Sequence, residues 1–86
     1  MADLKELRGE IDEIDEQIIR FLANRAKVCR AIGTEKKKKG VPIHDATREK
    51  EVYAKVRQQA SKLGLNPDEV EAIYRQIVNM CSSVQE

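Results

Sequence analysis

Residues 4–36, LKELRGEIDEIDEQIIRFLANRAKVCRAIGTEK, have the pattern of one long amphipathic helix. Their apolar residues recur at alternating spacings of three and four, like the a and d positions of a coiled coil. This row, the seam, consists of Leu4, Leu7, Ile11, Ile14, Ile18, Phe21, Val28 and Ile32. At position 25, where the seam calls for an apolar side chain, the sequence has Arg25. Because a charge facing a helical core is costly without a partner, Arg25 predicts a small anionic ligand there.

This helix is predicted to begin near Asp3, a residue type that caps helix N-termini well, and to run to about Lys38. At 1.5 Å per residue such a helix spans roughly 50 Å, which exceeds the diameter of so small a domain. The rest of the chain is too short to cover the whole seam, whereas a second copy of the same helix can cover it. We therefore predict an intertwined helical homodimer.

Two shorter helices are predicted to follow a loop. The first begins around Asp45 and ends at Gly64, with Asp45 or Thr47 as its N-cap. The second has Asn66 as its N-cap and Pro67 at its first position. The short link between them predicts an antiparallel hairpin. The predicted fold class is therefore all-α, with one long and two shorter helices in each chain.

The composition limits the classes of function. A chain of 86 residues makes one domain, predicted to cover residues 1–86. The net charge of +1, from 16 basic and 15 acidic residues, argues against a dedicated nucleic-acid-binding protein. No apolar run approaches the roughly 20 residues that span a bilayer. The first residues also lack the pattern of a secretory signal. We expect neither nucleic acid nor membrane as a partner.

The two cysteines, Cys29 and Cys81, have neither metal-ligand spacing nor a CxxC arrangement. With only one His in the chain, a zinc site is not expected, and no other metal or cofactor is predicted. Both cysteines are predicted to be reduced thiols in a cytoplasmic protein.

Polar residues recur on the inward-facing stripes of all three predicted helices. Lys36 lies eleven residues after Arg25, and at about 100° per residue it returns to within about 20° of the same face. The others are Asp45, Arg48 and Glu49, then Gln85. Each has an ordinary explanation alone, as a cap, a first-turn charge or a frayed helix end. Together they predict a buried, mostly cationic pocket that suits a small dianion with a hydroxyl group.

The sequence also lacks several familiar kinds of catalytic group. It has no Ser/His/Asp grouping, no positioned Cys–His pair and no Gly-rich phosphate loop. The one histidine, His44, falls in the connecting loop and is predicted to be exposed. Any chemistry should therefore depend on positioning and electrostatics, without a covalent intermediate.

Three segments together resemble a known family. They are LRGEIDEIDEQIIRFLANR at 7–25, GVPIHDATREKEV at 40–52 and IYRQIVNMCSSVQ at 73–85. In these segments and across nearly its whole length, the chain resembles the all-helical AroQ-class chorismate mutases. These are intertwined-dimer enzymes of aromatic amino-acid biosynthesis. The resemblance implies an isomerase that converts chorismate into prephenate by a concerted [3,3] rearrangement, without a cofactor.

The resemblance also implies roles for particular residues. Arg8 is expected to reach into the partner's site and to pair with a substrate carboxylate there. Arg25 is expected to bind a carboxylate from the same chain, and Lys36 to bind a carboxylate and the ether oxygen. Gln85 falls on a further donor to that oxygen. Asp45 and Glu49 match the residues around the substrate hydroxyl.

Two more positions follow from the same resemblance. Arg48 matches an arginine that supports the site near a carboxylate. Cys81 lies where the family usually has a small hydrogen-bonding residue such as Ser, and a thiol is a weaker donor. Lower substrate affinity is therefore expected. Since the sequence ends one residue after Gln85, local mobility of the last turn is expected as well.

Two alternatives remain open. An isochorismate-pyruvate lyase shares the fold and would also use a cationic pocket, but Asp45 and Glu49 together fit the mutase better. A non-catalytic helical dimerisation module is the second alternative. Arg25 argues against it, because a simple spacer gains nothing from an unpaired core charge.

Overall fold

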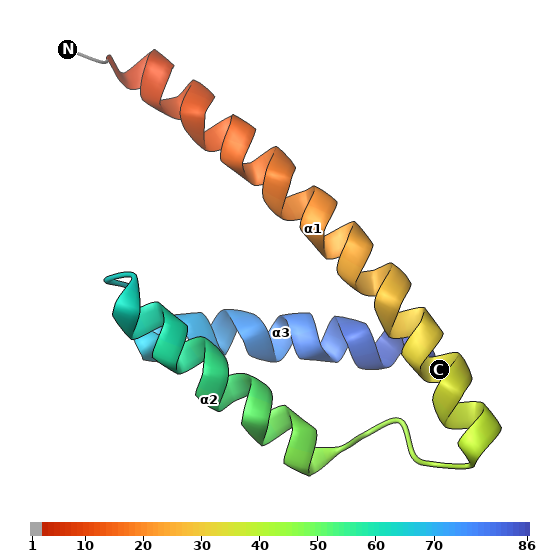
Figure 1. Ribbon diagram of the computed structural model, residues 1–86. Helices are drawn as coiled ribbons and strands as arrows, with labels where there is room; N and C mark the ends of the chain where they lie inside the picture. The colour runs from red at the N-terminus through yellow and green to blue at the C-terminus, as the bar shows by residue number, and fades with distance from the viewer. Residues whose placement is uncertain (1–2) are drawn as a thin grey trace.

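The computed structural model describes residues 3–86 and contains three helices. They are α1 (Leu4–Lys39), α2 (Ala46–Lys62) and α3 (Pro67–Gln85), shown in Figure 1. Within the described residues there is no β-strand. The prediction of an all-α chain with one long and two shorter helices is confirmed. Residues 1 and 2 of the predicted domain lie outside the described residues.

The ends of α1 follow from local side-chain and backbone chemistry. Asp3 caps the N-terminus, and its Oδ1 accepts a hydrogen bond from the Glu6 N–H at 2.8 Å. At the other end Gly40 adopts a left-handed conformation with φ of 66°, which glycine reaches without steric strain. Its N–H donates to the carbonyls of Lys36 and Lys37, so the helix ends there.

The second and third helices form the predicted antiparallel hairpin (Figure 1). Asp45 is the N-cap of α2, with Oδ1 accepting from the Arg48 N–H at 3.0 Å. Asn66 caps α3 in the same way, with Oδ1 accepting from the Asp68 N–H at 2.9 Å. Both predicted start signals are therefore correct.

The long helix packs on the hairpin only through its C-terminal half. Figure 1 shows the N-terminal half of α1 extending away from the other two helices, and the longest dimension of the chain is 57 Å. The face of α1 that α3 covers carries Ala26, Cys29 and Gly33. Val78 of α3 is also buried, as are Val56 and Ala60 of α2. The core of the single chain is thus small and contains none of the seam.

All eight seam residues are exposed, from 42% for Ile32 to 71% for Phe21. Seam residues from Leu4 to Phe21 lie on the part of α1 that no other helix of the described chain covers. A continuous apolar row of this length is typical of an interaction surface.

The structure contradicts the prediction of two reduced thiols. Cys29 of α1 and Cys81 of α3 form a disulfide, with their Cα atoms 5.4 Å apart. The two residues are 52 positions apart in the sequence, and only the crossing of α3 over α1 brings them together. Sequence spacing tests for metal sites and CxxC motifs, but it does not show which helix faces pack against each other.

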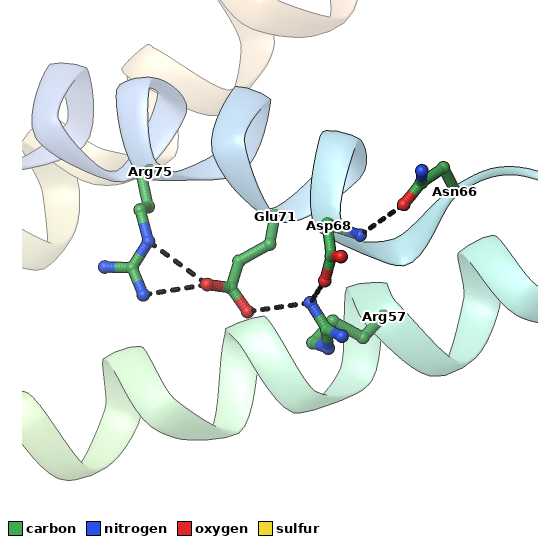
Figure 2. Close-up of polar contacts among 5 residues, drawn as sticks. All are labelled: Arg57, Asn66, Asp68, Glu71 and Arg75. Carbon is green, nitrogen blue, oxygen red and sulfur yellow. Dashed lines mark hydrogen bonds and ion pairs between the residues drawn. The ribbon is translucent and has the colours of Figure 1, made fainter.

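Charged side chains join α2 to α3 on the outer side of the hairpin (Figure 2). Arg57 contacts Asp68 at 2.9 Å and Glu71 at 3.3 Å, and Arg75 contacts Glu71 at 2.8 Å. The Arg75 guanidinium also lies 4.6 Å from the ring centre of Tyr53. The hydrogen bond from Arg75, followed by the nearby charges of Arg75 and Arg57, lowers the pKa of Glu71. Through Arg57, this partly exposed network bridges the two helices.

Candidate active site

A cavity of about 420 Å³ lies between the C-terminal half of α1, the start of α2 and the end of α3. Apolar side chains form much of its wall, including Val28, Ile32, Val52 and Val78. The cavity brings together seven of the eight predicted site residues: Arg25, Lys36, Asp45, Arg48, Glu49, Cys81 and Gln85. They come from all three helices, so the tertiary fold assembles this group.

From α1 the cavity receives two half-buried cations, Arg25 and Lys36. Arg25 Nη1 donates to the Cys29 Sγ at 3.6 Å, a contact with a weak acceptor. Lys36 Nζ donates to the Ile43 carbonyl, which ties the loop between α1 and α2 to the end of α1. A guanidinium has five N–H donors and an ammonium has three, so both groups keep donors for a ligand.

From α2 the cavity receives Asp45, Arg48 and Glu49. Asp45 acts as the helix cap and also lines the cavity, so both explanations offered by the sequence apply to it. The exposed Arg48 lies at the edge, where its Nη1 contacts Glu51 Oε2 at 3.4 Å. Glu49 is half-buried. The start of α2 thus supplies both carboxylates and a third cation.

Gln85 comes from the last turn of α3 and is half-buried against α1. Its Nε2 donates to the Cys81 Sγ at 3.3 Å and keeps a second N–H. Its Oε1 is buried and has no hydrogen-bond partner among residues 3–86. Buried polar atoms usually have a partner, so this unpaired oxygen is an exception within the described residues.

Cys81 lines the cavity as a disulfide sulfur. The resemblance treats it as a thiol that donates weakly to substrate, and this expectation is wrong in one respect. A disulfide has no S–H, so Cys81 offers neither a donor nor a nucleophile. That Cys81 contacts the substrate stays a prediction, and the contact would now be apolar.

Arg8 is the one predicted site residue that the structure does not bring to the cavity. It is exposed on the free N-terminal half of α1. It precedes Arg25 by seventeen residues, which is about 25 Å along a helix. Within one chain Arg8 is therefore too far away to touch a ligand bound beside Arg25.

Cys29 and Ser82 also line the cavity, although the sequence did not predict them as site residues. Helical spacing could have found them. Cys29 follows Arg25 by four residues, and Ser82 precedes Gln85 by three, so each shares a stripe with a predicted site residue.

Within the described range, no three His, Cys, Asp or Glu side chains are grouped so that they could hold a metal ion. None of the three helices in that range is long and apolar enough to cross a membrane.

Fold and cavity together define an all-helical protein with a partly apolar pocket that three helices line and that carries three cations and two carboxylates. The sequence profile of the family described as chorismate mutase type II matches residues 7–86. The chain belongs to this family, which confirms the resemblance found in the sequence.

Individual relatives agree with this assignment. A bifunctional chorismate mutase/prephenate dehydratase of Aquifex aeolicus is 43% identical over 88 aligned residues, which cover 99% of this chain and 24% of the relative. The chain thus spans about a quarter of the length of that protein. A chorismate mutase of Methanocaldococcus jannaschii is 38% identical over 55 residues, covering 64% of this chain and 56% of the relative.

Among solved structures, a conserved hypothetical protein from Pyrococcus furiosus has a TM-score of 0.79 and 37% sequence identity. The alignment covers 100% of this chain and 99% of that one. The similarity therefore extends over the whole three-helix arrangement.

Proposed function

We propose that this chain is a chorismate mutase, an isomerase that converts chorismate into prephenate in the biosynthesis of phenylalanine and tyrosine. The observation that carries the proposal is the clustering of seven candidate residues around one cavity of about 420 Å³. Small-molecule sites commonly measure about 300–1,000 Å³. The family match and the activities named for two relatives support the same function.

The charge of the cavity suits the two carboxylates of chorismate. Arg25 and Lys36 lie on α1, and Arg48 lies on α2. Hydrogen bonds between cations and carboxylates are about twice as strong as neutral ones, and guanidinium groups bind carboxylates through paired donors. In this proposal Arg25 binds one carboxylate, Lys36 also contacts a carboxylate, and Arg48 supports the site from its edge.

The rate acceleration is attributed to Lys36 and Gln85. In the concerted rearrangement the C–O bond breaks early, so negative charge grows on the ether oxygen. Lys36 Nζ and the free N–H of Gln85 Nε2 can donate to that oxygen from α1 and α3. Donors that are already oriented in a pocket with little water reorganise little during the reaction. The arginines hold the substrate in the compact, chair-like conformation that the rearrangement needs.

The substrate hydroxyl is assigned to the two carboxylates of α2. Glu49 is half-buried at the cavity and can accept a hydrogen bond from it. Asp45 uses Oδ1 as the helix cap and keeps Oδ2 for a second contact. None of these roles requires a metal or a covalent intermediate.

We further infer that the functional unit is an intertwined homodimer. The exposed seam on α1 supports this inference, because a second copy of the same helix has the apolar spacing to cover it. In such a dimer Arg8 of each chain reaches the partner's cavity and pairs with a substrate carboxylate. The family profile covers nearly the whole chain, which supports a single mutase domain over residues 1–86.

The cytoplasm is the compartment proposed for this enzyme. A disulfide is unusual in most cytoplasmic proteins, but intracellular proteins of hyperthermophilic archaea and bacteria are rich in disulfides. The Cys29–Cys81 bond fits this compartment if the source organism is one of these.

The test is the loss of chorismate absorbance in the presence of the purified chain, with the product identified. Formation of prephenate is the expected result. Activity on isochorismate alone, with release of pyruvate, would identify the lyase instead. If the chain converts neither compound, the enzyme proposal is overturned, and the non-catalytic dimerisation module becomes the favoured alternative.

A further inference from the structure

The Cys29–Cys81 disulfide lies between two residues that the proposed mechanism uses. Arg25 precedes Cys29 by one helical turn and donates to its Sγ, at 3.6 Å. Gln85 follows Cys81 by one turn and donates to its Sγ, at 3.3 Å. The covalent bond between α1 and α3 therefore lies inside the cavity wall, directly beside the candidate catalytic groups.

The bond matters more to Gln85 than to Arg25. Arg25 lies in the middle of α1, so its position depends on a long, continuous helix. Gln85 is the last residue of α3. Cys81, one turn earlier, is the point at which the chain joins this last turn covalently to α1.

The opposite side of Gln85 is also closely packed. A Cβ on Gly33 would lie 3.0 Å from the Cα, Cβ and Cγ of Gln85, so the two backbones are in close contact there. When the disulfide is reduced, its two sulfur atoms must separate to a non-bonded distance. The contact with Gly33 leaves Gln85 no room to move toward α1, so loss of the covalent bond frees the last turn of α3 to move away from α1 and the cavity.

We propose that the Cys29–Cys81 disulfide is a positioning device for Gln85, so that turnover depends on the oxidation state of this cysteine pair. The inference depends on the proposed mutase function. The oxidised chain holds the Gln85 carboxamide in the cavity, and the reduced chain binds substrate but stabilises the ether oxygen less. Cys29 and Cys81 act through Gln85 and do not react with the substrate.

The redox step is an ordinary thiol–disulfide exchange. A dithiol reductant breaks the bond between the two Sγ atoms and is itself oxidised to a disulfide. Two electrons and two protons pass to the protein, and Cys29 and Cys81 each become a thiol. A small-molecule disulfide that accepts the same electrons and protons reverses the step.

The experiment compares kcat and KM of the full chain before and after treatment with dithiothreitol. Thiols are counted by alkylation and mass measurement, and helix content is followed by circular dichroism. Removing a preoriented donor lowers kcat by about 10²–10³-fold. Displacing Gln85 without removing it should lower kcat by less, about tenfold, while KM stays within about twofold because Arg25 lies in the middle of α1 and keeps its place there. Re-oxidation should restore kcat.

Two variants show whether the effect acts through Gln85. Cys29→Ala cannot form the bond, so its kcat should match that of the reduced chain and should not respond to reductant. In Gln85→Ala the oxidised and reduced forms should have equal kcat, because the group that the bond positions is gone. If the disulfide only stabilises the fold, reduction would lower kcat by the same factor in the wild-type chain and in Gln85→Ala.

Each other outcome overturns the inference. A reduced chain with two free thiols and unchanged kcat would show that Gln85 needs no covalent anchor. An equal loss in Gln85→Ala, or a loss of helix content on reduction, would show that the bond serves stability alone. If the oxidised wild-type chain does not convert chorismate at all, the proposed function itself fails, and this result is distinct from the others.

Discussion

Gly33 of α1 and Gln85 of α3 lie so close that a Cβ on Gly33 would come within 3.0 Å of the Gln85 Cα. In Gly33→Ala the last turn of α3 must move by a few tenths of an ångström. Alanine also favours the helix by about 1 kcal/mol over glycine, so α1 itself is strengthened. We expect kcat to fall severalfold, with little loss of thermal stability, measured by steady-state kinetics and thermal unfolding.

Gly9→Ala is the matched control, because a Cβ there meets nothing within 4 Å in the chain. It carries the same gain in helix propensity without the contact to Gln85. Equal kinetics for the two alanine variants would contradict a positional role for Gly33.

Lys36→Ala removes the cation assigned to the ether oxygen. By analogy with oxyanion-hole donors, we expect kcat/KM to fall by about 10²–10³-fold, which corresponds to roughly 3–4 kcal/mol in the barrier. Lys38→Ala is the control, because Lys38 is exposed and pairs with Glu35 at 3.7 Å away from the cavity. If both variants lose activity equally, the effect comes from the positive charge of the helix end and not from a contact with substrate.

Ile14→Glu puts a charge in the middle of the exposed seam. If a second copy covers the seam, the buried carboxylate destabilises the dimer. Sedimentation or light scattering should then give a monomer, and activity should be lost with it. Glu16→Ala, on another face where Glu16 pairs with Arg20 at 2.9 Å, should remain a dimer. A dimeric Ile14→Glu variant would contradict the proposed interface.

We expect the stability of the α2–α3 hairpin to depend on pH through Glu71. Its hydrogen bond with Arg75 lowers its folded pKa below the ordinary value of 4.5. Between the lowered folded pKa and the ordinary pKa, Glu71 is therefore protonated more often in the unfolded chain than in the folded chain. The stabilisation is full above the ordinary pKa and is lost as the pH falls through the lowered folded pKa.

Thermal unfolding of the wild-type chain and of Glu71→Gln, followed from about pH 7 to about pH 3, tests this contribution. The wild-type midpoint should decrease more than that of the variant as the pH falls. Parallel curves for the two proteins would show that Glu71 does not contribute.

The sequence was informative wherever the cause is local. Asp3, Asp45 and Asn66 cap the helices as their residue types predict, because capping depends on a few neighbouring atoms. Lys36 also lies with Arg25 at the cavity, because helical periodicity alone puts them on one stripe. The family resemblance added Arg8, which periodicity did not distinguish.

The packing between helices could not be predicted in the same way. The seam suggested that the apolar stripe of α1 faces its neighbours, yet α3 covers a different face, at Ala26, Cys29 and Gly33. Two of these residues are small, so they add little to a hydrophobic pattern, although they allow close approach of α3. The disulfide was missed for the same reason, because it depends on where two helices cross.

Arg8 and Gln85 allow the most direct test of a catalytic site shared between two chains. Arg8→Ala and Gln85→Ala are each expected to be nearly inactive as homodimers. When the two variants are co-expressed, random pairing gives about half mixed dimers, and each has one intact site if Arg8 acts in the partner's cavity. We expect the mixture to recover about a quarter of wild-type chorismate turnover. A mixture that contains mixed dimers but is no more active than either variant alone would contradict this expectation.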